Sequence, residues 1–305
     1  MTERSAIVLF GYHDVGAECL DVLLERGERV VAVFTHEDDP AEQRWFRSVS
    51  ALAISAGVPV YMPEDPNRPE WVERVRRLHP TLLLSCYYRR MLGVKLLSVP
   101  DRGAFNMHGS LLPRYRGRAP VNWAILNGET RTGVTLHAMV PRPDAGAIVD
   151  QEAVPIGPRD TARQVFDRIT AAARVVLTRS IDDLKEGRAA ARPQDESQAS
   201  YYGRRTAEDG RIDWAWSAAR IFNLVRAVTH PYPGAFTTVN GRRVRVWWVE
   251  PSEAQGRPGE VLSLRPLVVA AGVGAVELVR VQWEGEPETD SDDTSGFALG
   301  LLCGD

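Results

Sequence analysis

The sequence predicts an α/β protein with an open, doubly wound sheet, followed by a smaller β-rich domain. A length of 305 residues favours two domains over one. Strand-like and helix-like segments alternate through the first two thirds of the chain, which is typical of a doubly wound sheet. Short strand-like runs separated by turns fill the last third and indicate a separate β-rich domain.

The first domain is predicted from apolar runs and from helical spacing. Residues 6–10 form a short apolar run, as in a buried parallel strand. Residues 161–186 repeat apolar side chains at the period of a helix. Ligands of such sheets usually lie outside the carboxyl ends of the strands. Further strands are expected at 29–35, 59–61, 82–85, 104–108, 131–140 and 148–154, and further helices at 15–26, 43–56 and 71–78.

A polar segment separates the two expected domains. We assign residues 1–190 to the first domain, 191–202 to a linker and 203–305 to the second domain. In the second domain, Asn240-Gly241 lies between two strand-like runs and predicts a β-hairpin. The elements expected there are one helix at 217–228 and strands at 235–239, 243–249, 259–264, 267–271 and 275–281.

Composition argues against several classes of protein. The net charge of −3 does not favour a broad nucleic-acid surface, and 44% hydrophobic with 25% charged residues excludes wholesale disorder. The N-terminus lacks the pattern of a signal peptide, and no run approaches the about 20 apolar residues of a membrane helix, so we expect a cytoplasmic protein. The three cysteines and six histidines show no disulfide or metal-site spacing, so we predict no metal.

The first strand ends in a turn that differs from a dinucleotide fingerprint. Only Gly11 and Gly16 are present, and His13-Asp14 occupies the middle, so we expect no nicotinamide or flavin cofactor. The turn is either a strand-to-helix connection capped by Asp14 or a loop that contacts substrate through Tyr12.

Asn106, His108 and Asp144 are the candidate catalytic residues. Asn106 and His108 are two apart on a predicted strand, so their side chains leave the same face at its carboxyl end. An amide donor can stabilise an oxyanion while an imidazole moves a proton, a combination that suits acyl transfer. Asp144 follows in a loop stiffened by Pro141 and Pro143, where it could orient the histidine and favour its protonated form.

The motif around these residues is long and specific. It reads Asn-x-His-x-Ser-Leu-Leu-Pro-x-x-Arg-Gly from Asn106, with Thr132-Gly133-Val134-Thr135 and Asp144-Ala145-Gly146 further on. Over nearly its whole length the chain resembles the formyltransferases that use 10-formyltetrahydrofolate. The resemblance implies a Rossmann-like catalytic domain, an OB-like C-terminal domain, and 10-formyltetrahydrofolate as co-substrate. It also implies that Asn106 stabilises the oxyanion, that His108 shuttles the proton, and that Asp144 holds the imidazole.

The resemblance also implies binding residues for the two substrates. Met91 and Leu92 would contact the pterin, although both also suit core packing. Arg204 and Arg205 are candidates for the nucleotide phosphates because a guanidinium fork suits phosphate, and Tyr12 is a further candidate for contact with substrate. Only two of the 37 basic residues are lysines, so an arginine pair here can equally be a solvated turn. The full set expected to contact folate is Arg90, Met91, Leu92, Arg118, Val140, Pro141, Arg142, Pro143 and Asp144.

The sequence resembles two branches of the family that differ in the acceptor of the formyl group. The run from Ser110 to Gly117 and the segment Arg211–Trp214 are shared with methionyl-tRNA formyltransferases. Other features resemble enzymes of lipid A modification and polymyxin resistance, which formylate the 4-amino group of UDP-4-amino-4-deoxy-L-arabinose; another nucleotide-linked amino sugar is the alternative. Such enzymes carry an NAD-dependent decarboxylase half that is absent here, so a fused or separate decarboxylase partner is expected. The distinguishing features are Tyr12-His13-Asp14, Phe34-Thr35-His36, Tyr87-Tyr88-Arg89, Arg116–Pro120 and Gly203–Thr206.

A binding module is the rival class of function. The second domain could bind tRNA through a strip formed by Arg242, Arg243 and Arg245. The net charge and the acidic segment 284–293 argue against this interpretation. A third possibility is a scaffold that binds folate but catalyses no reaction. The presence of Asn106, His108 and Asp144 argues against that possibility.

Overall fold

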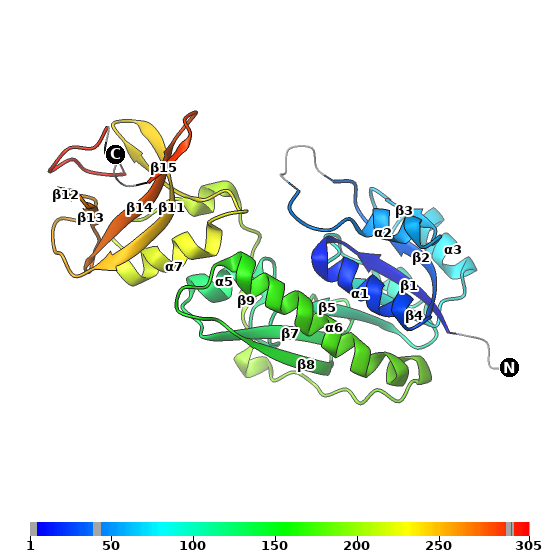
Figure 1. Ribbon diagram of the computed structural model, residues 1–305. Helices are drawn as coiled ribbons and strands as arrows, with labels where there is room; N and C mark the ends of the chain where they lie inside the picture. The colour runs from blue at the N-terminus through cyan, green and yellow to red at the C-terminus, as the bar shows by residue number, and fades with distance from the viewer. Residues whose placement is uncertain (1–4, 39–43, 291–293, 295, 305) are drawn as a thin grey trace. The chain divides into compact units, whose positions relative to one another are not determined.

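The computed structural model describes residues 5–38, 44–290, 294 and 296–304 (Figure 1). These residues form two compact units, each described by itself. The first unit contains the described residues up to Pro120 with Arg131–Pro155 and Phe166–Tyr202. The second contains Val121–Thr130, Ile156–Val165 and the described residues from Gly203 onward.

The first unit is built on a seven-stranded sheet in the order β3-β2-β1-β4-β5-β7-β8. The predicted Rossmann-like order holds over the first five of these strands, which pair in parallel. Strand β7 pairs antiparallel with both β5 and β8, so it alone in this sheet runs against the other strands, which the sequence pattern did not predict. The bounds are β1 Ala6–Gly11, β2 Arg29–Phe34, β3 Val60–Tyr61, β4 Leu82–Cys86, β5 Ala104–His108, β7 Arg131–Ala138 and β8 Ile148–Pro155.

Helices follow most of these strands. Ser48 caps α2 by accepting a hydrogen bond from the Ala51 N–H (3.2 Å), so α2 begins at Val49 and not at residue 43 as predicted. Residues 44–48 precede the helix, and residue 43 lies outside the described residues. The bounds are α1 His13–Glu25, α2 Val49–Ser55, α3 Pro69–Arg77, α4 Val94–Leu97, α5 Pro120–Leu126 and α6 Ala162–Glu186.

Apolar packing on the sheet explains why these runs form strands. Residues Ala6 to Phe10 of β1 are at most 3% exposed, as expected for a strand covered on both faces. Phe10 and Phe34 stack with ring centroids 4.5 Å apart, and Val75 of α3 packs in the same core cluster. This packing fixes the carboxyl ends of β1, β2 and β4 next to one another.

The segment expected to be a linker packs on the first unit. Arg192 exchanges two backbone hydrogen bonds with Ile148 at the start of β8 (2.8 and 2.9 Å). Strand β9 (Tyr201–Tyr202) pairs in parallel with β6 (Arg116–Gly117). A short 3₁₀ turn, η1 (Glu196–Gln198), lies between these two attachments. The domain boundaries expected from the sequence remain a prediction.

The second unit contains a six-stranded antiparallel sheet and the helix α7 (Ala218–Val228). Its strands run from yellow to red in Figure 1, in the order β10-β11-β14-β13-β12, with β15 beside β14. The predicted hairpin is confirmed, because Asn240 (φ 51°) and Gly241 (φ 75°) form the turn between β10 and β11. The bounds are β10 Ala235–Val239, β11 Arg242–Ser252, β12 Val261–Leu264, β13 Leu267–Ala270, β14 Ala275–Trp283 and β15 Glu288–Asp290, with a 3₁₀ turn η2 at Ala207–Gly210.

Candidate active site

Strands β5 and β7 place the first candidate residues. Strand β5 has the predicted bounds and ends at His108. In the antiparallel register Asn106 lies opposite His137, and His108 lies opposite Thr135. Residues directly opposite each other share one face of a sheet, so the face that carries Asn106 and His108 also carries His137.

Asn106 is held by a histidine that sequence reasoning did not select. The Nδ1 atom of His137 lies 2.9 Å from the Ala138 carbonyl oxygen, which can only accept, so Nδ1 carries the hydrogen. In neutral His137 the Nε2 atom is therefore an acceptor, and it lies 3.2 Å from Asn106 Nδ2. One amide hydrogen of Asn106 is thereby used, and the other remains for a second acceptor.

His108 is buried, with 6% of its surface exposed. Its Nε2 atom donates to the carbonyl oxygen of Tyr115 (2.9 Å), because that oxygen can only accept. Its Nδ1 atom lies 3.6 Å from Asp144 Oδ1, too far for a direct hydrogen bond but close enough for charge interaction. Nδ1 is therefore the ring nitrogen that is not bound to the backbone.

Asp144 joins the group from the loop between β7 and β8. Its Oδ1 atom lies 3.6 Å from both His108 Nδ1 and His137 Nε2, and its Oδ2 accepts from the Gly117 N–H (2.8 Å). Burial alone would raise the pKa of Asp144, but the charges that His108 and His137 carry when protonated, together with the Gly117 N–H, outweigh it and hold that pKa well below its usual range. The structure thus brings the three predicted catalytic residues together with an ionised carboxylate at their centre.

The predicted folate contacts divide into exposed and buried residues. Met91 (52%) and Val140 (38%) expose apolar side chains, which suit a flat aromatic ring. Leu92 is 3% exposed and packs in the core cluster, in line with the alternative considered for it. Arg118 donates to the carbonyl oxygen of Arg89 (2.9 Å), and Arg142 pairs with Glu196 (3.0 Å). The remaining residues of this set outside the trio, Arg90, Pro141 and Pro143, are exposed.

Tyr12 lies in an aromatic cluster where β1, β2 and β4 end. We call Tyr12, His36 and Tyr88, together with the Arg89 guanidinium that lies over the Tyr12 ring, the aromatic cluster. His36 stacks on Tyr88 (ring centroids 4.1 Å apart) and meets the edge of Tyr12 (5.3 Å). The Arg89 guanidinium lies 4.6 Å from the centre of the Tyr12 ring, and the Tyr12 hydroxyl donates to Asp38 (3.1 Å).

Arg204 and Arg205 belong to the second unit. Arg204 is exposed, whereas Arg205 lies over the ring of Trp123 (4.7 Å) and donates to the Asp209 carbonyl oxygen (2.6 Å). Burial lowers the pKa of Arg205. The proposed basic strip is partly neutralised, because Arg242 pairs with Glu286 (2.7 Å) and Arg243 with Glu208 (2.8 Å).

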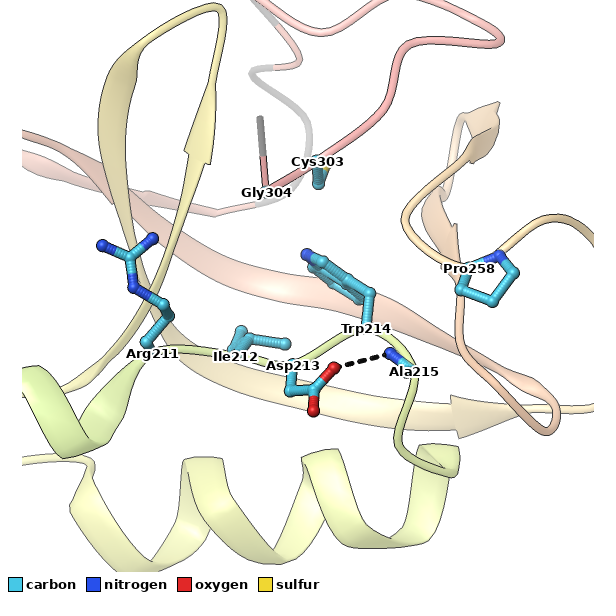
Figure 2. Close-up of a pocket in the computed structure, with 8 residues that line it drawn as sticks. All are labelled: Arg211, Ile212, Asp213, Trp214, Ala215, Pro258, Cys303 and Gly304. Atoms are coloured by element: carbon cyan, nitrogen blue, oxygen red, sulfur yellow. Dashed lines mark hydrogen bonds between the residues drawn. The ribbon is translucent and has the colours of Figure 1, made fainter.

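A hollow in the second unit has a volume of about 400 Å³ (Figure 2). Asp213, one of the residues that line it, accepts a hydrogen bond from the Ala215 N–H (3.0 Å). None of the candidate catalytic residues lines it. Its lining residues are Arg211, Ile212, Asp213, Trp214, Ala215, Pro258, Cys303 and Gly304.

The described residues contain neither a metal-binding cluster nor a membrane-spanning helix. Within these ranges no group of three or more His, Cys, Asp or Glu side chains is arranged to hold a metal ion. The described helices include none with the length and hydropathy needed to cross a membrane.

Solved structures of similar fold include three informative ones. An N-formyltransferase from Helicobacter canadensis, in complex with folinic acid and dTDP-3-aminofucose, is 20% identical, with a TM-score of 0.71 over 90% of this chain and 99% of that one. WlaRD, a sugar 3N-formyl transferase in the presence of dTDP and 5-N-formyl-THF, is 18% identical, with a TM-score of 0.70 over 93% and 100%. HypX from Aquifex aeolicus with tetrahydrofolic acid is 18% identical, with a TM-score of 0.64 over 94% of this chain and 46% of that one.

Family models identify the chain itself. Residues 3–181, more than half of the chain, match the formyl transferase model. Residues 204–296 match the model of the formyl transferase C-terminal domain. The chain therefore belongs to the formyl transferase family and is an enzyme that transfers formyl groups.

Proposed function

We propose that this enzyme transfers the formyl group of 10-formyltetrahydrofolate to the amino group of a nucleotide-linked sugar. The observation that carries the proposal is the convergence of Asn106, His108 and Asp144 in a chain of the formyl transferase family. Two of the similar structures, an N-formyltransferase in complex with dTDP-3-aminofucose and a sugar 3N-formyl transferase, support a sugar amine as acceptor.

The chain's own residues can perform each step. When bound, 10-formyltetrahydrofolate supplies a formyl carbon that the sugar amine attacks, so a new C–N bond forms and the bond to folate N10 breaks. The free amide hydrogen of Asn106 stabilises the oxyanion that forms on the formyl oxygen. His108 takes the proton from the attacking amine at Nδ1 and returns it to the leaving N10. Asp144 stabilises the imidazolium between these two transfers.

Folate binding is supported by the exposed apolar surface beside this site. Met91 and Val140 offer the side chains that a pterin ring would cover, and residues 140–144 offer backbone groups to its hydrogen-bonding edge. Arg118 reaches the backbone of Arg89 and ties its loop to the segment that precedes Met91. Leu92 would take part only through its backbone, because its side chain is buried.

We infer further that the acceptor is UDP-4-amino-4-deoxy-L-arabinose, formylated on its 4-amino group as in the formyltransferase domain of the polymyxin-resistance protein ArnA. Three of the sequence features that resemble ArnA contribute the aromatic cluster, from the ends of β1, β2 and β4. Their convergence at the carboxyl edge of the sheet supports a shared role in binding the sugar nucleotide. For Arg204 and Arg205, a contact with the nucleotide stays a prediction from the sequence. A decarboxylase partner and a place in lipid A modification follow from the same inference.

The test measures tetrahydrofolate release with three acceptors in parallel: UDP-4-amino-4-deoxy-L-arabinose, dTDP-3-aminofucose and initiator methionyl-tRNA. Turnover with the UDP sugar is expected. Turnover with the dTDP sugar alone would refute the choice of sugar but not the class, whereas turnover with tRNA alone would refute the sugar-amine proposal. The His108→Ala variant serves as the control for contaminating activity.

A further inference from the structure

A fully buried arginine lies one residue before the glycine that binds Asp144. Arg116 is 0% exposed, and its guanidinium makes all its side-chain hydrogen bonds with a segment about 80 residues further along the chain. Its Nε and Nη2 donate to Gln194 Oε1 (3.0 and 2.7 Å), and its Nη1 donates to the Tyr201 hydroxyl (2.6 Å). Both terminal nitrogens also donate to the Glu196 carboxylate (3.1 and 2.6 Å). Arg116 thus fixes the segment that was expected to be a linker.

Gln194 links Arg116 to the loop that contains Asp144. Its Nε2 donates to the carbonyl oxygens of Asp144 and Gly146, both at 2.7 Å. The orientation of the amide is unambiguous, because the guanidinium only donates and the two carbonyls only accept. Gln194 therefore uses its oxygen toward Arg116 and its nitrogen toward the loop.

Asp144 needs such support because of its backbone conformation. Its φ is 54°, in the left-handed region that residues other than glycine seldom adopt. The Gly117 N–H holds its carboxylate (2.8 Å), and Gln194 holds its carbonyl oxygen (2.7 Å). The two attachments meet again in β6, where Arg116 and Gly117 are adjacent.

We propose that Gln194 is a positioning residue for formyl transfer: anchored by Arg116, it holds the Asp144–Gly146 backbone so that the Asp144 carboxylate stays beside His108 and His137. The inference rests on the proposed function and deepens it. As proposed, Gln194 acts through Asp144 and touches none of the reacting atoms.

The decisive variant is Gln194→Glu, which keeps the shape and the acceptor for Arg116 but replaces the amide donor by an oxygen facing two carbonyls. We expect kcat to fall about 10-fold or more, because a small displacement of a catalytic group is costly, while KM for the sugar changes little. Gln194→Ala removes both ends without adding charge and should show the same loss of kcat. Gln198→Ala is the matched control, since Gln198 is exposed in the same segment and donates only to Asp195.

Two further measurements separate positioning from packing. In an Asp144→Asn background, Gln194→Glu should cause little additional loss, because residues that act as one unit are not additive. In side-chain NMR spectra, Gln194→Glu should shift the ring signals of His108 and His137 in the direction that Asp144→Asn does, and leave those of exposed His79 unchanged. Wild-type kcat in both Gln194 variants, a full additional loss in the Asp144→Asn background, or unchanged His108 and His137 signals would each overturn the inference.

The proposed function can fail independently. If the wild-type protein releases no tetrahydrofolate with any sugar amine, the acceptor proposal is refuted. The NMR comparison then still decides whether Gln194 positions Asp144, because it requires no turnover.

Discussion

Acid should destabilise this protein through His36, and a His36→Gln substitution should remove that effect. His36 is partly buried, and its Nε2 accepts a hydrogen bond from the Arg89 N–H (2.9 Å). Protonation of Nε2 would place the new hydrogen against the hydrogen of the Arg89 N–H. Burial lowers the pKa of His36 most, and the charges of Arg90 and Arg89 lower it further, from 6.5 to about 4.

The direction of the pH effect follows from which state binds the proton first. Between pH 6.5 and about 4 the unfolded chain carries a proton on His36 that the folded chain does not, so the free energy of unfolding falls as the pH falls through this window. Above pH 6.5 the contribution is constant. The shift corresponds to about 3 kcal/mol at most, and solvent screening of this partly exposed ring reduces our expectation to about 1–2 kcal/mol.

Urea denaturation at pH 7 and pH 4.5 measures the effect. Many carboxylates also titrate in this range, so the informative quantity is the difference between variants in the loss of unfolding free energy. His36→Gln keeps an acceptor for the Arg89 N–H and should lose about 1 kcal/mol less than the wild type over this range. His79→Gln, at an exposed histidine, should lose as much as the wild type. An equal loss in His36→Gln and the wild type would refute the reasoning.

Three further predictions concern the site and its rival interpretation. Asn106→Ala should lower kcat by about 10²–10³-fold, the usual value of an oxyanion donor, and His108→Ala should nearly abolish turnover. Both variants should have melting temperatures close to that of the wild type. Wild-type activity in either variant would contradict the assigned roles. Gly146→Ala should lower both the melting temperature and kcat, because a Cβ there would lie 1.8 Å from the Ala138 carbonyl oxygen, whereas Gly203→Ala has open space and should change neither. A tRNA gel shift should show no retention at physiological salt, and a salt-sensitive shift would instead favour a nucleic-acid site.

Local patterns in the sequence predicted local structure well. The bounds of β5 and the shared face of Asn106 and His108 follow from strand alternation alone, and Asn240-Gly241 identified the hairpin. The direction of β7 and β8 could not be found in this way. A buried antiparallel strand and a buried parallel strand have the same apolar run, and β7 is buried over most of its length.

That missing direction explains why His137 was overlooked. His137 follows Asn106 by 31 residues, and nothing nearby in the sequence distinguishes it from the other histidines. Once β7 is known to run antiparallel beside β5, the register places His137 opposite Asn106 and Thr135 opposite His108. The signal was therefore present in the pairing of two strands and absent from either strand alone.

The polar segment before β9 illustrates a second limit. Gln194 and Glu196 have the composition of a solvated linker, and Glu196 is indeed exposed. Both accept hydrogen bonds from the buried guanidinium of Arg116, about 80 residues away, and no local pattern connects that arginine to them. Polar composition describes equally well a segment that binds water and one that completes a buried hydrogen-bond network.

In the proposed function, the residues assigned to formyl transfer and those assigned to the acceptor lie on different strands. The residues assigned to chemistry lie on β5, β7 and the loop after β7, whereas the aromatic cluster lies at the ends of β1, β2 and β4. If the aromatic cluster binds the sugar nucleotide as proposed, Tyr12→Phe should raise KM for the sugar and leave kcat nearly unchanged, because it removes only the hydroxyl that contacts Asp38. A fall in kcat at unchanged KM would instead assign Tyr12 to the chemical step. Steady-state kinetics with the sugar varied at saturating folate distinguish these two results.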